Sequence, residues 1–252
     1  MADFIRHELG KVSREQITDK SLNSLVSYVD KTAEERLVTG LRQLLPGSVF
    51  LTEENTVGQE QGEFQWVVDP LDGTTNFLHQ LPCFAVSVAL RQGEQTILGV
   101  VYEVNRRECF YAWKGGGAFL NDQKIHVSQT EKLHDSLIAT GFPYSDFERL
   151  PSYFTAFEYF MKNTQGLRRF GAAAVDLAWV ACGRFDAFFE YGLSPWDLAA
   201  GALIVQEAGG IVSDFRRGGN YLFEEELVAA NPAVYGEVMA AVEAAFSPEG
   251  EA

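Results

Sequence analysis

The 252-residue chain has little cysteine, few positive charges and no long hydrophobic run. Its three cysteines are too few and too far apart for a disulfide framework or a zinc knuckle, which favours reduced thiols and a cytoplasmic location. No apolar run approaches the ~18 residues of a membrane span, and the charged N-terminus lacks the apolar segment of a signal peptide. Neither secretion nor a membrane partner is therefore expected.

Basic residues are outnumbered by acidic ones, 20 Lys and Arg against 35 Asp and Glu, which gives a formal net charge of −15. A surface of this sign repels a nucleic acid backbone, so direct nucleic acid binding is not expected. An acidic protein that handles an anionic substrate needs local cations, which metal ions or single Arg and Lys side chains can supply. The hydrophobic content of 46% is that of an ordinary globular protein with one large or two small domains.

The hydrophobic periodicity predicts an α/β protein in which helices cover sheets. In the first half, a helix is expected at 31–45, strands at 49–51 and 64–68, and an antiparallel meander at 84–90, 96–104 and 108–113. In the second half, helices are expected at 146–163, 172–182, 195–208 and 232–246, with strands at 185–190, 211–213 and 227–230. We interpret the chain as a single unit, 1–252, with an N-terminal half of about 1–140 and a C-terminal half of about 141–252.

Several common catalytic signatures are absent. There is no Gly-x-Ser-x-Gly nucleophile elbow, and the four histidines show no metal-ligand spacing. The three glycines from Gly115 to Gly117 lack the Lys-Ser/Thr of a phosphate loop and lie between expected strands. We interpret them as a hairpin turn.

The densest group of potential ligands lies in residues 66–77, Trp-Val-Val-Asp-Pro-Leu-Asp-Gly-Thr-Thr-Asn-Phe. An expected strand ends at Asp69-Pro70, and Asp72 follows three residues after Asp69. Two carboxylates on one tight turn repel unless a cation lies between them, and hard oxygen ligands suit Mg²⁺ or Mn²⁺. Gly73 allows the backbone to approach a ligand closely, and the N–H groups after it would face an anion. On spacing alone, a plain β-to-α turn with capping Asp side chains remains the alternative.

Two further acidic positions have ordinary structural explanations when taken alone. Glu53 and Glu54 follow the strand expected at 49–51, where a solvated strand edge is common. Asp197 lies in the first turn of the helix expected at 195–208, where the helix dipole favours a negative charge.

Together, these segments resemble the inositol monophosphatase family. Residues 66–77 match its WxxDPxDGTxNF motif, and residues 196–210 match its WDxAAGxxxxxEAGG motif. Asp30 and Glu34 resemble the family's VTxxDxxxE segment. Glu53 and Glu54 lie where the family has Gly-Glu-Glu, with Thr52 in place of the glycine. The motifs occur in the right order along nearly the whole chain.

The resemblance implies a layered αβαβα sandwich, a homodimer, and hydrolysis of a phosphate monoester that is sensitive to lithium. It implies two or three Mg²⁺ ions, with Mn²⁺ as an alternative, and in-line attack by a metal-activated water. Carried over residue by residue, the ligands of the first metal are Glu53, Asp69 and the backbone carbonyl of Leu71. The ligands of the second metal are Asp69, Asp72 and Asp197.

The resemblance also implies roles around the phosphate and the substrate. Thr74 resembles the hydroxyl that helps Glu53 to orient the attacking water, and Gly73 and Thr74 resemble the backbone cradle for the phosphate. Ala173 matches a small residue that lines the substrate pocket, and Glu190 resembles the acid that accepts a hydrogen bond from a substrate hydroxyl.

The expected substrate is a small phosphorylated polyol, with inositol 1-phosphate first because Glu190 and the Pro195-Trp196-Asp197 segment follow the inositol pattern. Relatives with the same metal scaffold handle fructose 1,6-bisphosphate and other sugar or nucleotide phosphates, and these remain alternatives. A different class of function, a protein-binding factor in the transcription machinery, also remains open. The intact carboxylates favour a chain that has kept catalysis.

Overall fold

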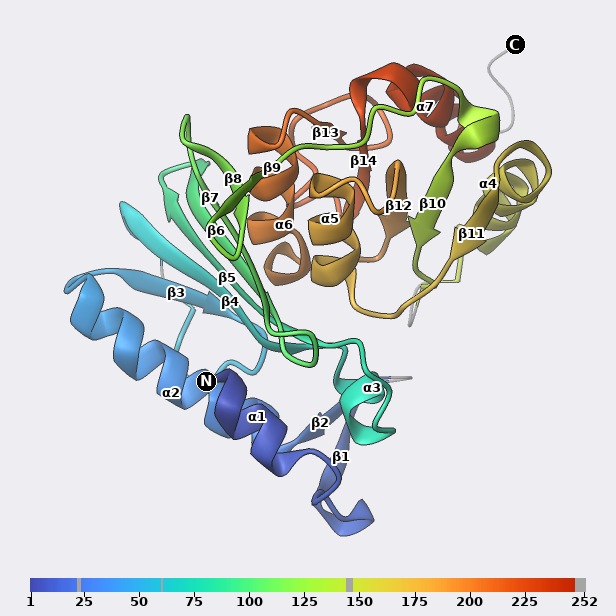
Figure 1. Cartoon of the computed structure of the whole chain (residues 1–252). Coiled ribbons are helices and arrows are strands. Elements are labelled where there is room, and N and C mark those ends of the chain that lie inside the picture. Colours follow the sequence, from blue (N-terminus) through green and yellow to red (C-terminus); the bar gives the residue numbers. More distant parts are fainter. Residues whose placement is uncertain (22–23, 60, 144–146, 248–252) are drawn as a thin grey trace.

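The computed structural model describes residues 1–21, 24–59, 61–143 and 147–247, and in this part of the chain the elements form a layered αβαβα sandwich (Figure 1). The predicted fold class is confirmed. A pair of helices covers the outer face of a seven-stranded sheet, a second pair lies between this sheet and a five-stranded one, and a third pair covers the far side. In the described residues, no helix combines the length and the apolar character needed to cross a membrane.

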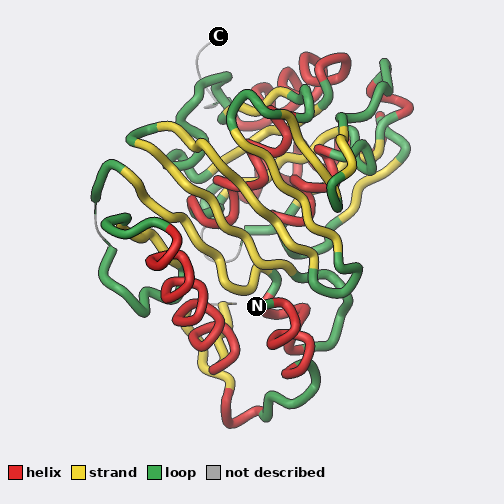
Figure 2. Tube along the Cα trace, turned by 60° about the vertical axis from the view of Figure 1, so that its left-hand side comes forward, coloured by secondary structure: helices red, strands yellow, loops and turns green. Residues whose placement is uncertain are grey.

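The outer layer is formed by α1 (Ala2–Glu8) and α2 (Tyr28–Leu44), joined through a hairpin of β1 (Ile17–Ser21) and β2 (Ser24–Ser27). Figures 1 and 2 show both helices against one face of the larger sheet. The sequence analysis predicted α2 but neither α1 nor the hairpin, because these three elements are only four to seven residues long. The helix α2 begins three residues earlier than predicted, at a Ser27 cap whose hydroxyl accepts a hydrogen bond from the Val29 N–H.

The larger sheet has the strand order β3-β4-β5-β6-β7-β8-β9. Its strands are β3 (Val49–Thr52), β4 (Phe64–Asp72), β5 (Ala85–Gln92), β6 (Gln95–Glu103), β7 (Glu108–Trp113), β8 (Gly117–Leu120) and β9 (Gln123–Ile125). Only the pairing of β3 with β4 is parallel, so the predicted antiparallel meander is confirmed. Gly115 and Gly116 lie in the turn between β7 and β8, and Gly117 begins β8, so these glycines belong to a hairpin, as predicted, and not to a phosphate loop.

The smaller sheet has the order β11-β10-β12-β14-β13. Its strands are β10 (Leu137–Thr140), β11 (Gly166–Arg168), β12 (Ala187–Tyr191), β13 (Ile211–Ser213) and β14 (Glu226–Ala230). The remaining helices are α3 (Thr74–Leu78), α4 (Leu150–Asn163), α5 (Ala173–Ala181), α6 (Pro195–Glu207) and α7 (Pro232–Phe246). The helix predicted at 146–163 begins at Leu150, since Pro151 fits its first turn; Asp146 lies outside the described residues.

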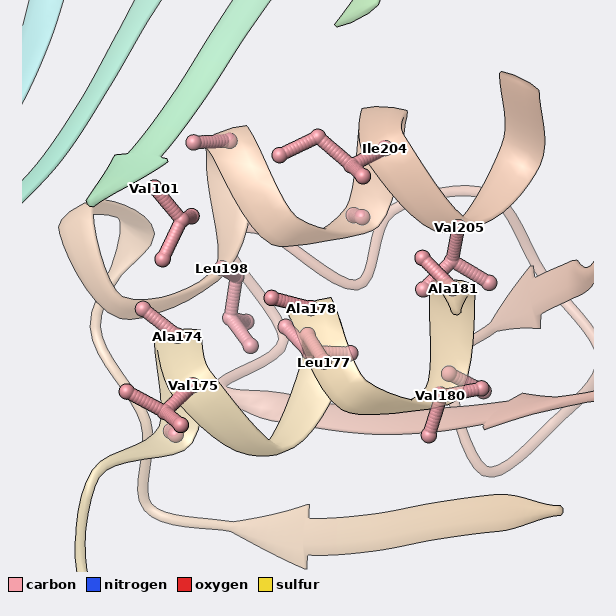
Figure 3. Packing of buried hydrophobic residues seen from close by; sticks show 14 of the residues in the cluster. Val101, Ala174, Val175, Leu177, Ala178, Val180, Ala181, Leu198, Ile204 and Val205 are labelled. Carbon is pink, nitrogen blue, oxygen red and sulfur yellow. The ribbon is translucent and has the colours of Figure 1, made fainter. Parts of the chain in front are cut away.

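The central layer is a pair of closely packed helices, α5 and α6. Figure 3 shows Leu177 and Ala178 of α5 and Leu198 of α6 in the space between the two helices. A Cβ atom on Gly201 of α6 would lie 2.6 Å from the Leu177 Cβ, so only glycine permits this approach. On the other side of α6, a Cβ on Gly99 of β6 would lie 2.7 Å from the Ala200 carbonyl oxygen. The helix α6 is thus fixed against both α5 and the larger sheet.

Candidate metal centre

Two carboxylates of the site lie at the end of a buried strand. Asp69 and Asp72 of β4 are 2% and 7% exposed. The strand continues through Pro70 to Asp72, whereas the sequence predicted that it ends at Asp69-Pro70. The pairing with β5 is irregular between Asp69 and Asp72, so no regular ladder position requires the N–H that Pro70 lacks. This irregular segment places both side chains at one edge of the sheet.

A third carboxylate comes from the other half of the chain. Asp197 is in the first turn of α6, and one ligand oxygen from each of Asp69, Asp72 and Asp197 lies within 4.8 Å of the other two. The close packing of α6 places Asp197 here, far in sequence from β4. Its position at a helix start agrees with the helix-dipole explanation, and it also lies beside two other carboxylates.

Backbone N–H groups orient each of the three carboxylates. The Asp69 Oδ1 accepts a hydrogen bond from the Leu71 N–H at 2.8 Å, and the Asp197 Oδ2 accepts one from the Ser194 N–H at 2.7 Å. The Asp72 Oδ2 accepts a bond from the Ala174 N–H at 2.9 Å, at the start of α5. These bonds fix the side chains without neutralising their charge.

The cluster is electrostatically costly without a cation. Burial, with Glu53, Asp72 and Asp197 nearby, raises the pKa of Asp69 well above its usual range. Burial also raises the pKa of Asp72 to about 7, although backbone N–H groups at the start of α5 act in the opposite direction. Oriented, buried carboxylate oxygens are the donor set that Mg²⁺ prefers, so these residues fit a divalent metal ion.

The fourth predicted carboxylate ligand, Glu53, follows β3 and is close enough to Asp69 for a side-chain hydrogen bond. The segment after it is held by Glu34 of α2, which is fully buried. The Glu34 carboxylate accepts hydrogen bonds from the Thr52 hydroxyl at 2.9 Å, the Glu54 N–H at 2.7 Å, and both the N–H and hydroxyl of Thr56 at 2.7 Å. Thr52, which replaces the family's glycine, is therefore one of the anchors of the Glu53 segment.

Replacing Glu34 by Gln should lower any catalytic activity of this centre by roughly tenfold. The amide N–H₂ of Gln would face the N–H and hydroxyl donors that Glu34 now accepts, and some of these buried donors would lose their acceptor. Glu35→Gln is the matched control, since Glu35 is the neighbouring residue and is exposed. Limited proteolysis should cut the segment after Glu53 faster in Glu34→Gln than in the control. Equal activity and equal cleavage in both variants would show that Glu34 does not position Glu53.

Thr74, at the start of α3, is tied to a residue without an assigned role in the sequence analysis. Its hydroxyl lies 2.8 Å from the Asp30 Oδ1 and 3.0 Å from the carbonyl oxygen of Leu71. Asp30 is fully buried, and its other oxygen accepts bonds from the Ser27 N–H and hydroxyl. A carboxylate is a stronger acceptor than a carbonyl group, so the Thr74 hydroxyl donates its hydrogen bond to Asp30.

Gly73 adopts a left-handed conformation with φ of 85°. A Cβ here would lie 3.0 Å from the Cys83 carbonyl oxygen and 3.3 Å from the Ala172 Cβ, so glycine is required for both reasons. The next turn is locked by Asn76, whose side-chain amide donates to the carbonyl oxygens of Cys83 and Phe170 at 2.8 and 2.7 Å. The sequence analysis considered only the backbone of Asn76.

The predicted substrate residues lie beside the cluster. Ala173 is the first residue of α5, next to the N–H that binds Asp72. Glu190 of β12 is 6% exposed, so it is not one of the solvated acidic residues that are common at strand ends. Burial and the nearby Asp197 raise the pKa of Glu190, whereas Arg169 acts to lower it. A Cβ on Gly141 would lie 1.9–2.1 Å from the Glu190 carboxyl group, so Gly141 provides the space for this side chain.

Arg169 is a functional candidate that the sequence analysis treated as an ordinary surface residue. It is exposed, yet its charge acts on the buried carboxyl groups of Glu190 and Asp176. The guanidinium also stacks over the Phe142 ring, 5.1 Å from the centroid. No local sequence signal distinguishes Arg169 from its neighbour Arg168, because only the fold brings it to these acids.

An αβαβα sandwich with oriented carboxylates at the meeting point of its layers is the arrangement of a metal-dependent enzyme. The sequence model of the inositol monophosphatase family matches residues 1–246, and the chain belongs to this family. The predicted resemblance is therefore confirmed. The coarse class follows from it: a phosphatase of a metal-dependent family that acts on small phosphorylated compounds.

Individual relatives agree with this family. "Nus factor SuhB" of Pasteurella multocida is 41% identical over 235 residues, 93% of this chain and 88% of the relative. The extragenic suppressor protein SuhB of Bartonella henselae superposes with a TM-score of 0.91 at 38% identity, covering 96% of this chain and 93% of that one. The IMPase of Thermotoga maritima superposes with a TM-score of 0.88 at 32% identity, covering 97% and 92%.

Proposed function

We propose that this chain is a Mg²⁺-dependent phosphomonoesterase that hydrolyses inositol 1-phosphate or a similar polyol monophosphate. The observation that carries the proposal is the cluster of Asp69, Asp72 and Asp197, with ligand oxygens within 4.8 Å of one another, beside the buried Glu190. The cluster supplies a place for metal ions, and Glu190 supplies an acceptor for a polyol hydroxyl.

Glu53, Asp69 and the Leu71 carbonyl would hold one Mg²⁺, and Asp69, Asp72 and Asp197 would hold a second; the number of ions is two or three, and Mn²⁺ could substitute. When bound, such ions neutralise charge on phosphoryl oxygens and lower the pKa of water. We also expect Li⁺ to inhibit the enzyme by competing at this carboxylate cluster.

The chain's own groups would position the reactants. The N–H groups of Gly73 and Thr74 would donate to the phosphate oxygens, and the left-handed Gly73 allows that approach. Because the Thr74 hydroxyl donates its hydrogen bond to Asp30, its lone pairs remain to accept a hydrogen bond from the attacking water. Glu53 would accept the second bond from that water, so that the water is oriented from two sides. No covalent nucleophile is needed.

Chelation should abolish phosphate release, and added Mg²⁺ should restore it. A panel of inositol 1-phosphate, fructose 1,6-bisphosphate, histidinol phosphate and 3′-phosphoadenosine 5′-phosphate, each assayed with EDTA, Mg²⁺ and Mn²⁺, tests the metal and the substrate together. Mg²⁺ should also raise the melting temperature, since a ligand that binds only the folded state stabilises it by about 2.7 kcal/mol at a hundredfold excess over Kd. Full activity in excess chelator would reject the metal centre.

A homodimer in the cytoplasm is part of the same proposal. The exposed apolar side chains Phe154 and Met161 of α4, 57% and 59% exposed, support an oligomeric contact on this helix. All three cysteines are free thiols, which supports a reducing compartment. Light scattering coupled to size-exclusion chromatography tests the oligomeric state.

A protein-binding role in the transcription machinery is the second candidate, favoured by the relatives named Nus factor SuhB. The acidic net charge of −15 favours a protein partner over direct contact with RNA. An Asp72→Asn variant separates the two roles in a reconstituted transcription reaction. If the chain has a binding role, both the parent and Asp72→Asn should change transcription termination. If its role is purely enzymatic, neither the parent nor this variant should change it.

A further inference from the structure

A pocket of about 560 Å³ lies near the start of β4, whereas the carboxylate cluster lies at the end of this strand. In the pairing of β4 with β5, Gln65 lies opposite Arg91 near the start of β4, whereas Asp69 lies opposite Ser87. Four residues of extended strand separate Gln65 from Asp69, or about 13 Å. The volume is in the range of small-molecule sites, roughly 300–1,000 Å³. The pocket is therefore separate from the proposed phosphatase site.

Arg91 is the positively charged residue among those that line this pocket, and it is 8% exposed. The exposed Glu94 lines the pocket as well. Its Nη1 donates to the Gln65 Oε1 at 3.4 Å and its Nη2 to the Glu94 carbonyl oxygen at 3.2 Å, both long bonds. Its Nε is buried without a hydrogen-bond partner. Across the described ranges, no Asp or Glu carboxylate forms an ion pair with this guanidinium.

A buried guanidinium without a carboxylate partner is unusual, since such charges are normally paired. Burial lowers the pKa of Arg91, and the nearby Glu94 and Tyr221 act in the opposite direction. The guanidinium nevertheless stays charged, because its pKa is far above neutrality. Glu94 and Tyr221 offset this desolvation only in part, and a bound anion would offset it further. A buried cation without an ion pair stands out in a chain with a net charge of −15.

Apart from the exposed Glu94, the other walls of the pocket favour an anion with a flat apolar part. The Phe223 ring stacks on the guanidinium, 5.2 Å from its centroid, and is 54% exposed at the same time. Leu51 adds apolar surface, and the amides of Gln59 and Gln61 can donate hydrogen bonds. Stacking fixes the plane of the guanidinium, and a planar fork recognises carboxylate or phosphate oxygens in pairs.

We infer that this pocket binds a small organic anion, with its carboxylate or phosphate group on Arg91 and its apolar part against Phe223 and Leu51. The inference is independent of the proposed phosphatase activity. It concerns a second site of the same chain.

Isothermal titration calorimetry of the Mg²⁺-loaded 252-residue chain with benzoate tests this inference. Benzoate should bind in the low millimolar range, and neutral benzamide should bind at least several-fold more weakly. Arg91→Met should weaken benzoate binding by roughly tenfold or more, the usual effect of losing a charged hydrogen-bond partner. Arg36→Met is the matched control and should change nothing, since Arg36 also stacks on an aromatic ring, that of Phe4, but outside the pocket.

Two further variants make the result decisive. Phe223→Ala removes an exposed ring, so it should keep the fold and still weaken benzoate binding several-fold. If Arg91→Met does not fold, Phe223→Ala takes its place in the test. Asp72→Asn should bind benzoate as the parent does, because it alters only the carboxylate cluster. The inference is overturned if the parent does not bind benzoate, or if Asp72→Asn loses this binding. It is also overturned if Arg91→Met binds benzoate as tightly as the parent does or, where that variant does not fold, if Phe223→Ala does so.

Discussion

Replacing Asp72 by Asn should lower the turnover of the phosphate monoester by two or more orders of magnitude, the scale seen when a charge-stabilising group is lost. Asn has nearly the size of Asp, and its amide oxygen can still accept the hydrogen bond from the Ala174 N–H. The fold should therefore survive while one negative charge of the proposed metal centre disappears. Turnover is measured with saturating Mg²⁺, and circular dichroism checks the fold. An intact variant within threefold of the parent would show that Asp72 is not a metal ligand.

The same substitution should make the metal-free protein more stable at high pH. Burial raises the pKa of Asp72 to about 7, against about 3.9 in an unfolded chain. A carboxyl group with a raised folded-state pKa contributes stability that is complete below pH ~4 and is lost as the pH rises through about 7. In EDTA, the parent should thus lose more unfolding free energy between pH 5 and pH 8 than Asp72→Asn does. Parallel curves from denaturant titrations would contradict this account.

Replacing Glu190 by Gln should lower kcat/KM for inositol 1-phosphate by roughly tenfold or more, because a charged acceptor for a substrate hydroxyl is replaced by a neutral one. The carboxylate is disfavoured beside a second phosphate, since like charges repel at short range. The parent should therefore prefer the monophosphate over fructose 1,6-bisphosphate, and Glu190→Gln should narrow this preference. Mg²⁺ dependence should stay, because Glu190 is outside the proposed ligand set.

Gly141→Ala tests the same position without changing the acid. Its new Cβ would overlap the Glu190 carboxyl group, which must therefore move. The preference for the monophosphate over fructose 1,6-bisphosphate should then narrow in this variant too. Gly40→Ala is the control, since a Cβ there meets no atom within 4 Å. A parent that prefers the bisphosphate, or an unchanged ratio in Glu190→Gln, would reject this assignment of the pocket.

The sequence alone was sufficient for much of the architecture. Short-range signals predicted α7 with its observed bounds, the meander from β5 to β7, and the glycine turn after β7. They also identified Asp69 and Asp72 as a pair, because both lie on one turn and their spacing is local. The motifs of the family then added Asp197 and Glu190, which no spacing argument could have joined to that pair.

Only the tertiary structure decided which distant residues meet. Asp197 reaches Asp69 because Gly201 lets α6 approach Leu177 of α5, a contact between segments that no local window includes. Packing between layers also buries Glu190, brings Glu34 to the segment that it binds, and buries the Arg91 guanidinium without an ion pair. Helix and strand preferences are fixed by neighbours within a few residues, whereas burial and electrostatic pairing depend on the whole fold. That is why the sequence predicted most of the longer elements and the proposed ligands, but not the residues that position those ligands.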